Sequence, residues 1–162
     1  MKSLNDKFNF VEGKFQLIEK DKNGIEKILV YDNNLVVNNA FTILAGLMTN
    51  PLPSKKIDTI KLGTGGIFNS IIQTPQKRDT QLYRETFSKQ GFTDIIINTV
   101  DELSITFMMI LGKDEANNLG ASIYNEAGLF SGNGIMFARK CFSEQLKTVE
   151  NEWTIKWTII FK

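Results

Sequence analysis

The sequence contains no histidine among its 162 residues. Histidine is the commonest general base near neutral pH, a member of the Ser-His and Cys-His pairs, and a frequent zinc ligand. Its absence excludes those pairs and most zinc sites. Because no other nucleophile and base form a recognisable set, we expect no catalytic residues, no metal site, no cofactor and no enzymatic activity.

Cysteine is almost absent as well. Cys141 is the only one, so the chain cannot form an internal disulfide, which fits assembly in a reducing cytoplasm. This cysteine falls in an apolar run typical of a strand. The position favours an inert buried thiol over a reactive nucleophile.

An excess of one charge and a long apolar run are also missing. The chain has 19 basic and 18 acidic residues, so no overall field favours nucleic acid or an anionic membrane. No segment approaches the roughly 20 apolar residues of a transmembrane helix. We therefore expect neither nucleic-acid binding nor a membrane span.

Strand patterns fill most of the chain, and the clearest lies at residues 153–161. Large apolar residues alternate there with threonine and lysine: Trp153, Ile155, Trp157, Ile159 and Phe161. A period of two with aromatic and β-branched residues predicts a half-buried strand. We expect its apolar face to form the centre of the core.

Turn signals separate further strands. Asn133-Gly134 lies between two apolar runs, which predicts a hairpin. Residues 21–24 predict a second hairpin within residues 1–31, which we consider as an attachment element. Asp32-Asn33-Asn34 is expected to break a strand, and Ser88–Gly91 to form a turn.

One helix is predicted, from Ala40 to Thr49. Its apolar residues cover most of its circumference, so we expect it to be buried in its own domain or against a neighbour. Together these patterns predict one domain over residues 1–162. The expected fold is mainly β: an antiparallel β-sandwich of about eight to ten short strands with one buried α-helix.

Three motifs have a chemical interpretation beside a structural one. The glycines of Gly63-Thr64-Gly65-Gly66 could cradle a phosphate, but no P-loop lysine follows, which favours a bend or bulge. Asp21-Lys22-Asn23-Gly24 resembles part of a calcium loop but lacks its length and closing glutamate, which favours a turn. The acidic pairs suggest glycoside chemistry, but both lie in predicted turns where solvation explains them: Asp101 with Glu102, and Asp114 with Glu115.

A candidate interface lies in the predicted strand Leu103–Leu111. One face of this strand is apolar throughout, and the second face also becomes apolar at Met108 and Ile110. Large exposed apolar patches usually mark an interface. We therefore expect a homo-oligomer or a tight contact with another protein, with Met108 and Ile110 near that contact.

Several short motifs resemble one family. They are Asn125–Phe130, Gly134–Lys140, Lys147-Thr148 and the closing strand, preceded by an asparagine-led helix and a strand ending in Leu62-Gly63-Thr64-Gly65. This order is similar to that of small structural proteins of tailed-bacteriophage tails and phage tail-like particles. The resemblance implies a tail-fibre, collar or baseplate component. Such a component would be assembled in the host bacterial cytoplasm, reside in the virion and contact other tail or baseplate proteins.

A carbohydrate-binding module for receptor recognition on the same particle is the alternative. Sugar sites favour exposed aromatic residues beside carboxylates or amides. Only 10% of the residues are aromatic, and both tryptophans fall on the predicted buried face. The sequence therefore favours a structural subunit over a sugar-binding module.

Overall fold

The computed structural model describes residues 11–49 and 56–162. Its main element is a nine-stranded antiparallel sheet in the order β6-β3-β9-β10-β2-β1-β11-β8-β7. The strands of this sheet are β1 (Val11–Lys20), β2 (Glu26–Val36), β3 (Ile57–Gly63), β6 (Glu85–Gln90), β7 (Asp94–Asn98), β8 (Ser104–Leu111), β9 (Ala121–Ser131), β10 (Met136–Thr148) and β11 (Glu152–Phe161). β4 (Ile67–Phe68) and β5 (Ile71–Ile72) form a separate two-stranded sheet.

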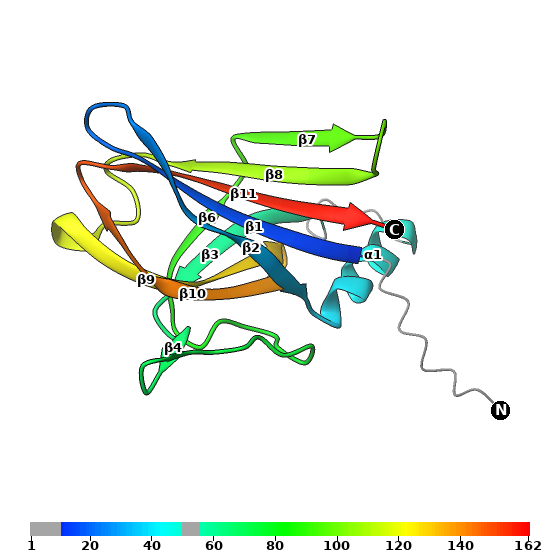
Figure 1. Cartoon of the computed structure of the whole chain (residues 1–162). Helices are drawn as coiled ribbons and strands as arrows, with labels where there is room; N and C mark the ends of the chain where they lie inside the picture. Colours follow the sequence, from blue (N-terminus) through cyan, green and yellow to red (C-terminus); the bar gives the residue numbers. More distant parts are fainter. Residues whose placement is uncertain (1–10, 50–55) are drawn as a thin grey trace.

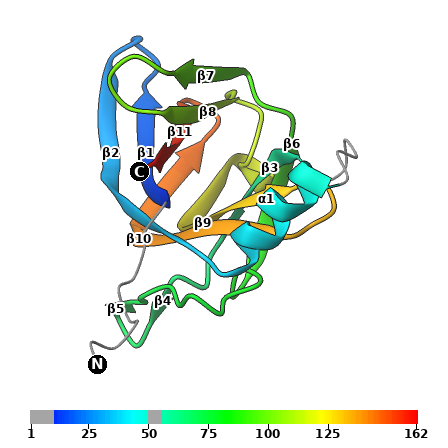
Figure 2. The same cartoon turned by 90° about the vertical axis from the view of Figure 1, so that its right-hand side faces the viewer.

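The sheet curls at β2, so that its two halves face each other (Figures 1 and 2). β2 pairs with β1 over most of its length but with β10 only through Leu35 and Val36. We call β7, β8, β11 and β1 half A, and β6, β3, β9 and β10 half B. The predicted mainly β, antiparallel, sandwich-like fold is confirmed.

The core between the halves is centred on β11, as the alternation in the sequence predicts. Trp153, Ile155, Trp157 and Ile159 are all buried, and β11 lies between β1 and β8. Phe15 of β1 meets the Trp157 ring edge to face, with centroids 4.9 Å apart. Aromatic pairs of this geometry add to the stabilisation from burial alone.

Two predicted boundaries are wrong. Asp32, Asn33 and Asn34 do not break the strand, because each pairs with a residue of β1. Tertiary pairing here overrides the local preference of asparagine for turns. Ser88–Gln90 likewise belong to β6, since they pair with β3, and the chain turns only at Gly91, whose φ is +87°.

The predicted hairpin around residues 21–24 is present, but its first strand is an interior strand of the sheet. β1 lies between β2 and β11 and buries Phe15 and Leu17 in the core. Residues 11–31 are therefore part of the sandwich itself. Residues 1–10 lie outside the described part of the chain.

The helix α1 (Asn39–Thr49) packs against β10 at one end of the sandwich (Figure 2). It buries Ala40 and Ile43, whereas Phe41 and Met48 are 51% and 87% exposed. The expected burial around the whole helix is thus not found among the described residues, because only one face of α1 meets the sheet. No described helix is long and apolar enough to span a membrane.

A third layer covers the outer face of half B. It is formed by residues 64–84, which we call the covering segment, and it includes β4 and β5 (Figures 1 and 2). Leu82 of this segment is buried in a small apolar cluster with Val37, Phe130 and Met136. Apolar packing therefore helps to hold the segment against the sheet.

Candidate functional site

The covering segment carries a short hairpin that displays apolar side chains. Ile67 pairs with Ile72 and Phe68 with Ile71, and Asn69-Ser70 form the two-residue turn between them. Asn69 and Ser70 have φ of 49° and 63°, the left-handed conformation that a type I′ turn requires. Phe68, the residue before this turn, is 66% exposed.

Glu126 of β9 anchors the covering segment to the sheet. Its side chain is fully buried, and its Oε1 accepts hydrogen bonds from the backbone N–H of Gly65 at 2.9 Å and of Arg84 at 2.8 Å. Its Oε2 accepts one from the N–H of Tyr83 at 3.0 Å and one from Arg139 Nη2 at 2.8 Å. A buried carboxylate is stable when it is paired and hydrogen-bonded in this way. Glu126 thereby joins both ends of the segment to the sheet.

Arg139 of β10 completes this buried cluster. Its Nη1 donates to Asp79 Oδ2 at 2.8 Å, and its guanidinium lies 4.6 Å from the centre of the Tyr83 ring. Burial opposes the charge of Arg139, but the surrounding acidic groups (Cys141 first, then Asp79 and Glu126) raise its pKa above the ordinary value. The cation thus connects the middle of the covering segment, at Asp79, with its end, at Tyr83.

The sequence predicts a bend or bulge at the glycine cluster, and the pairing of β3 with β6 does shift register between Leu62 and Gly63. The cluster also allows close backbone approach, which the sequence did not indicate. A Cβ atom on Gly66 would lie 2.0 Å from the carbonyl oxygen of Asn125, and one on Gly65 would lie 2.4 Å from Tyr83 Cβ. The N–H of Gly65 and that of Gly66 donate to the side chains of Glu126 and Asn125. The turn does bind an anionic group, but that group is the protein's own Glu126 and not a phosphate.

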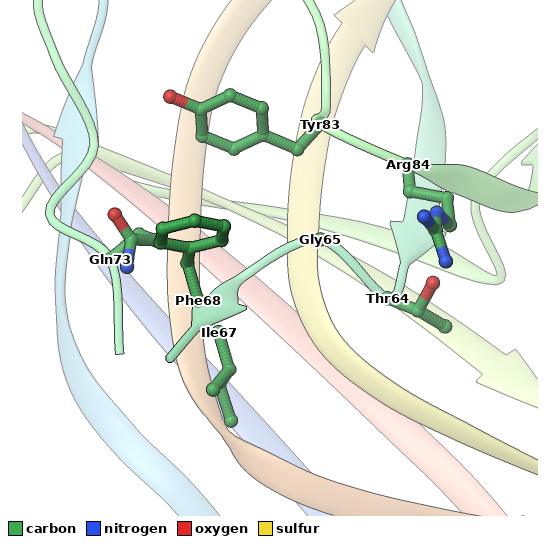
Figure 3. Close-up of a pocket in the computed structure, with 7 residues that line it drawn as sticks. All are labelled: Thr64, Gly65, Ile67, Phe68, Gln73, Tyr83 and Arg84. Atoms are coloured by element: carbon green, nitrogen blue, oxygen red, sulfur yellow. The ribbon is translucent and has the colours of Figure 1, made fainter. Parts of the chain in front are cut away.

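A pocket of about 490 Å³ opens where the two ends of the covering segment meet. Its volume falls in the range of small-molecule sites. Its lining residues are Thr64, Gly65, Ile67, Phe68, Gln73, Tyr83 and Arg84 (Figure 3).

The pocket combines aromatic faces with hydrogen-bonding groups. Figure 3 shows the rings of Tyr83 and Phe68 on one side of Gly65, and the side chains of Arg84 and Thr64 together on the other. The Tyr83 side chain is 72% exposed although its backbone N–H is fixed by Glu126. Aromatic faces beside a few polar groups are the usual lining of a ligand site.

The acidic pairs singled out in the sequence do not form a joint site. Asp101 and Glu102 precede β8, whereas Asp114 and Glu115 follow it. An eight-residue strand spans about 27 Å, which is far beyond the separation of glycosidase carboxylates. Glu115 instead accepts a hydrogen bond from Lys89 Nζ at 2.6 Å, which holds the pKa of its carboxyl below the usual range. In the described part of the chain, no three side chains of the metal-ligating types cluster.

The other residues predicted from sequence lie away from the pocket. Met108 and Ile110 are half-buried and alternate along β8 with the buried Phe107, Met109 and Leu111, so they lie on the outer face of half A. Figure 1 shows β8 on the side of the molecule opposite β4. Cys141 is buried, as predicted, and burial raises the pKa of its thiol to about 11. The interface role of Met108 and Ile110 stays a prediction.

Lys147 has a structural task that its place in the Lys147-Thr148 motif did not reveal. Its side chain is fully buried, and its Nζ donates to the carbonyl oxygens of Gly112 and Asn151 at 2.8 Å and of Thr148 at 3.1 Å. Burial lowers the pKa of the ammonium group. The lysine joins the β10–β11 turn to the loop that follows β8.

The sequence reasoning missed Phe68, Tyr83 and the buried pair beneath them. The only local signal was a charge within each of two apolar strands, Glu126 and Arg139. Nothing local indicated that the covering segment would return to them. A comparison with protein-family models, with curated proteins and with solved structures finds no match to this chain.

Proposed function

We propose that this chain is a structural subunit of a phage tail or a phage-derived tail-like particle. It would act as a baseplate, collar or tail-fibre attachment component through contacts with other tail proteins. The observation that carries the proposal is the covering segment: it is anchored by a buried ionic cluster, yet it leaves Phe68, Ile71 and Tyr83 66%, 66% and 72% exposed. Exposed apolar groups held on a fixed element are typical of a contact surface.

The motifs behind the family resemblance support the same proposal. Gly65, Glu126 and Arg139 belong to three separate motifs, and the structure brings all three into one cluster. The three motifs therefore fold together into one packed unit. Such a unit is what a subunit of a larger assembly needs to present a constant surface.

Particle incorporation tests the proposal. Tail-like particles would be purified from the bacterium that encodes the chain, and the chain would be quantified in them by mass spectrometry. We expect a constant copy number per particle for the wild type and strong depletion for a Phe68→Asp, Ile71→Asp variant. Lys22→Asp, which changes an exposed residue of the β1–β2 turn, is the matched control and should incorporate normally. Absence of the wild-type chain from purified particles contradicts the proposal.

A carbohydrate-binding module is the second candidate, favoured by the pocket itself. Phe68 and Tyr83 offer exposed ring faces, and Gln73 and Arg84 offer an amide and a guanidinium beside them. Glycan-array binding followed by calorimetry distinguishes the two functions. Sugar binding predicts saturable heat that Tyr83→Ala abolishes, whereas a purely structural subunit gives no heat with any glycan.

A further inference from the structure

The edge strand β7 is unusually open. It is the last strand of the nine-stranded sheet and pairs only with β8 among the described residues. All five of its residues are exposed, and the side chains of Ile95, Ile96 and Ile97 are 49%, 51% and 63% exposed. Figures 1 and 2 both show its outer side without a neighbouring strand. The outer backbone groups of β7 therefore have no strand partner in the described part of the chain, although the N–H of Ile95 donates to Asp94 Oδ1 at 2.8 Å. They coincide with three apolar side chains.

The opposite edge of the same sheet is protected. β6 carries charged residues, and two of them form ion pairs at this edge: Glu85 with Lys61, and Lys89 with Glu115. Charged residues, prolines and bulges are the usual devices that prevent an edge strand from pairing with another chain. The only charged residue of β7 is Asp94 at its first position, and the strand has no proline and no bulge in its pairing with β8. This difference between the two edges suggests that another strand pairs with β7.

The sequence of β7 fits a second copy of itself. If two β7 strands pair antiparallel about a two-fold axis at Ile96, then Ile95 faces Ile97 of the second copy and Asp94 faces Asn98 of the second copy. The two Asp94 carboxylates are then about 14 Å apart along the strands. A register centred on Asp94 would place like charges opposite each other, which destabilises a strand pair. Charge repulsion and apolar contact thus both favour the register with the two-fold axis at Ile96.

The side chains of β7 also continue the apolar surface of half A. Ile95 and Ile97 pair with Phe107 and Ile105 of β8, so they lie on the inner face. Ile95 lines an apolar hollow of about 240 Å³ that Ile105 and Phe107 share. A second copy paired at this edge would extend this apolar face with its own Ile95 and Ile97. Cross-strand pairs of this kind are the unit of sheet stabilisation.

We propose that two copies of this chain associate through β7, residues 94–98, to form one continuous antiparallel sheet. Such closed two-fold pairing is the commonest symmetry of homo-oligomers. The biological role of this interface rests on the proposed function, in which subunits must assemble. The test of dimerisation itself does not depend on that function. Met108 lies opposite Asp94 on β8, so its outer face adjoins the proposed interface.

Sedimentation velocity over a concentration series tests the interface. We expect the wild-type mass to rise from the monomer value of 18.4 kDa towards a dimer. Ile96→Lys places two cations together at the axis and should raise the dimer dissociation constant more than about tenfold. Val100→Lys removes a side chain that is 88% exposed beyond the strand and should leave dimerisation unchanged. Mixing Ile96→Lys with Ile96→Glu should give a heterodimer that forms more tightly than either variant dimerises alone.

Hydrogen exchange on the wild type provides a second test that needs no variant. The amides of residues 94–98 that face outward should become more protected as protein concentration rises. A wild type that stays monomeric, or a dimer that Ile96→Lys does not weaken, overturns the proposal. Protection that appears only when purified tail proteins are added assigns the edge to a different partner and also overturns it. If the chain dimerises through β7 but is absent from particles, this inference stands and only the proposed function is contradicted.

Discussion

Arg139 and Glu126 form a buried ion pair on adjacent strands, with Nη2 and Oε2 2.8 Å apart and both side chains almost inaccessible to water. The pair lies beneath a surface segment with little regular structure, on the face of the sheet, where strand pairing cannot supply backbone hydrogen bonds. Glu126 satisfies three backbone N–H groups of that segment, which would otherwise be buried without partners.

Removing the cation should therefore be costly. Arg139→Met leaves Glu126 buried without its charged partner, and we expect the free energy of unfolding to fall by about 3–5 kcal/mol. Urea denaturation followed by tryptophan fluorescence measures this change. Lys162→Met is the matched control, because the Lys162–Glu12 pair is about half exposed and should contribute no more than about 1 kcal/mol. Equal losses in the two variants would contradict a structural role for the buried pair.

The glycine cluster should not tolerate a methyl group. Gly66→Ala places Cβ against the carbonyl oxygen of Asn125, which is backbone and cannot rotate away, so we expect a loss of about 1–3 kcal/mol or more. Gly112→Ala meets its nearest atom at 3.7 Å and should be nearly neutral. Thermal unfolding of both variants by circular dichroism compares them. A neutral Gly66→Ala would show that the covering segment can leave the sheet at little cost.

The closing strand gives a prediction about its two faces. Trp157 is fully buried against Phe15, so Trp157→Ala should lower the free energy of unfolding by about 3–5 kcal/mol. Lys156 lies on the opposite face, and Lys156→Ala should be nearly neutral. Soluble yield and denaturant midpoints measure both effects, and comparable effects would contradict the assignment of the faces.

Cys141 should be chemically silent in the folded protein. Because burial raises the pKa of its thiol to about 11, almost no thiolate is present at pH 8. We expect iodoacetamide to label it only after denaturant is added, with intact mass spectrometry as the readout. Rapid labelling of the native protein would mean that the covering segment opens readily.

Glu115 should make the folded state sensitive to acid. Lys89 lowers the pKa of Glu115 below its ordinary 4.5, so this contact stabilises the fold fully above that pH and is lost as the pH falls through the lowered value. Glu115→Gln should therefore reduce the pH dependence of stability below about pH 4.5. Glu102→Gln, at an exposed turn residue, is the control, and an identical pH dependence in wild type and Glu115→Gln would contradict the expectation.

The fold was predictable where the signal is local. The alternation from Trp153 to Phe161 and the turn at Asn133-Gly134 each lie within a few residues, and both features are found in the structure. Asp32–Asn34 were misread because the ladder that keeps them extended comes from β1. The candidate site depends on partners that are distant in sequence, such as Asp79, sixty positions from Arg139. No periodicity or spacing encodes such a contact.

The place of β1 beside β11 has a consequence for synthesis of the protein. Val11 is paired with Phe161, so half A lacks its central strand until residues 152–161 have left the ribosome. The β9–β10 hairpin closes through a short turn, whereas the β1–β11 pair must close nearly the whole chain at a larger entropic cost. Contacts so distant in sequence slow folding. Until β11 has emerged, β1 lacks its partner on this side, and nascent chains at this stage are the most prone to aggregate.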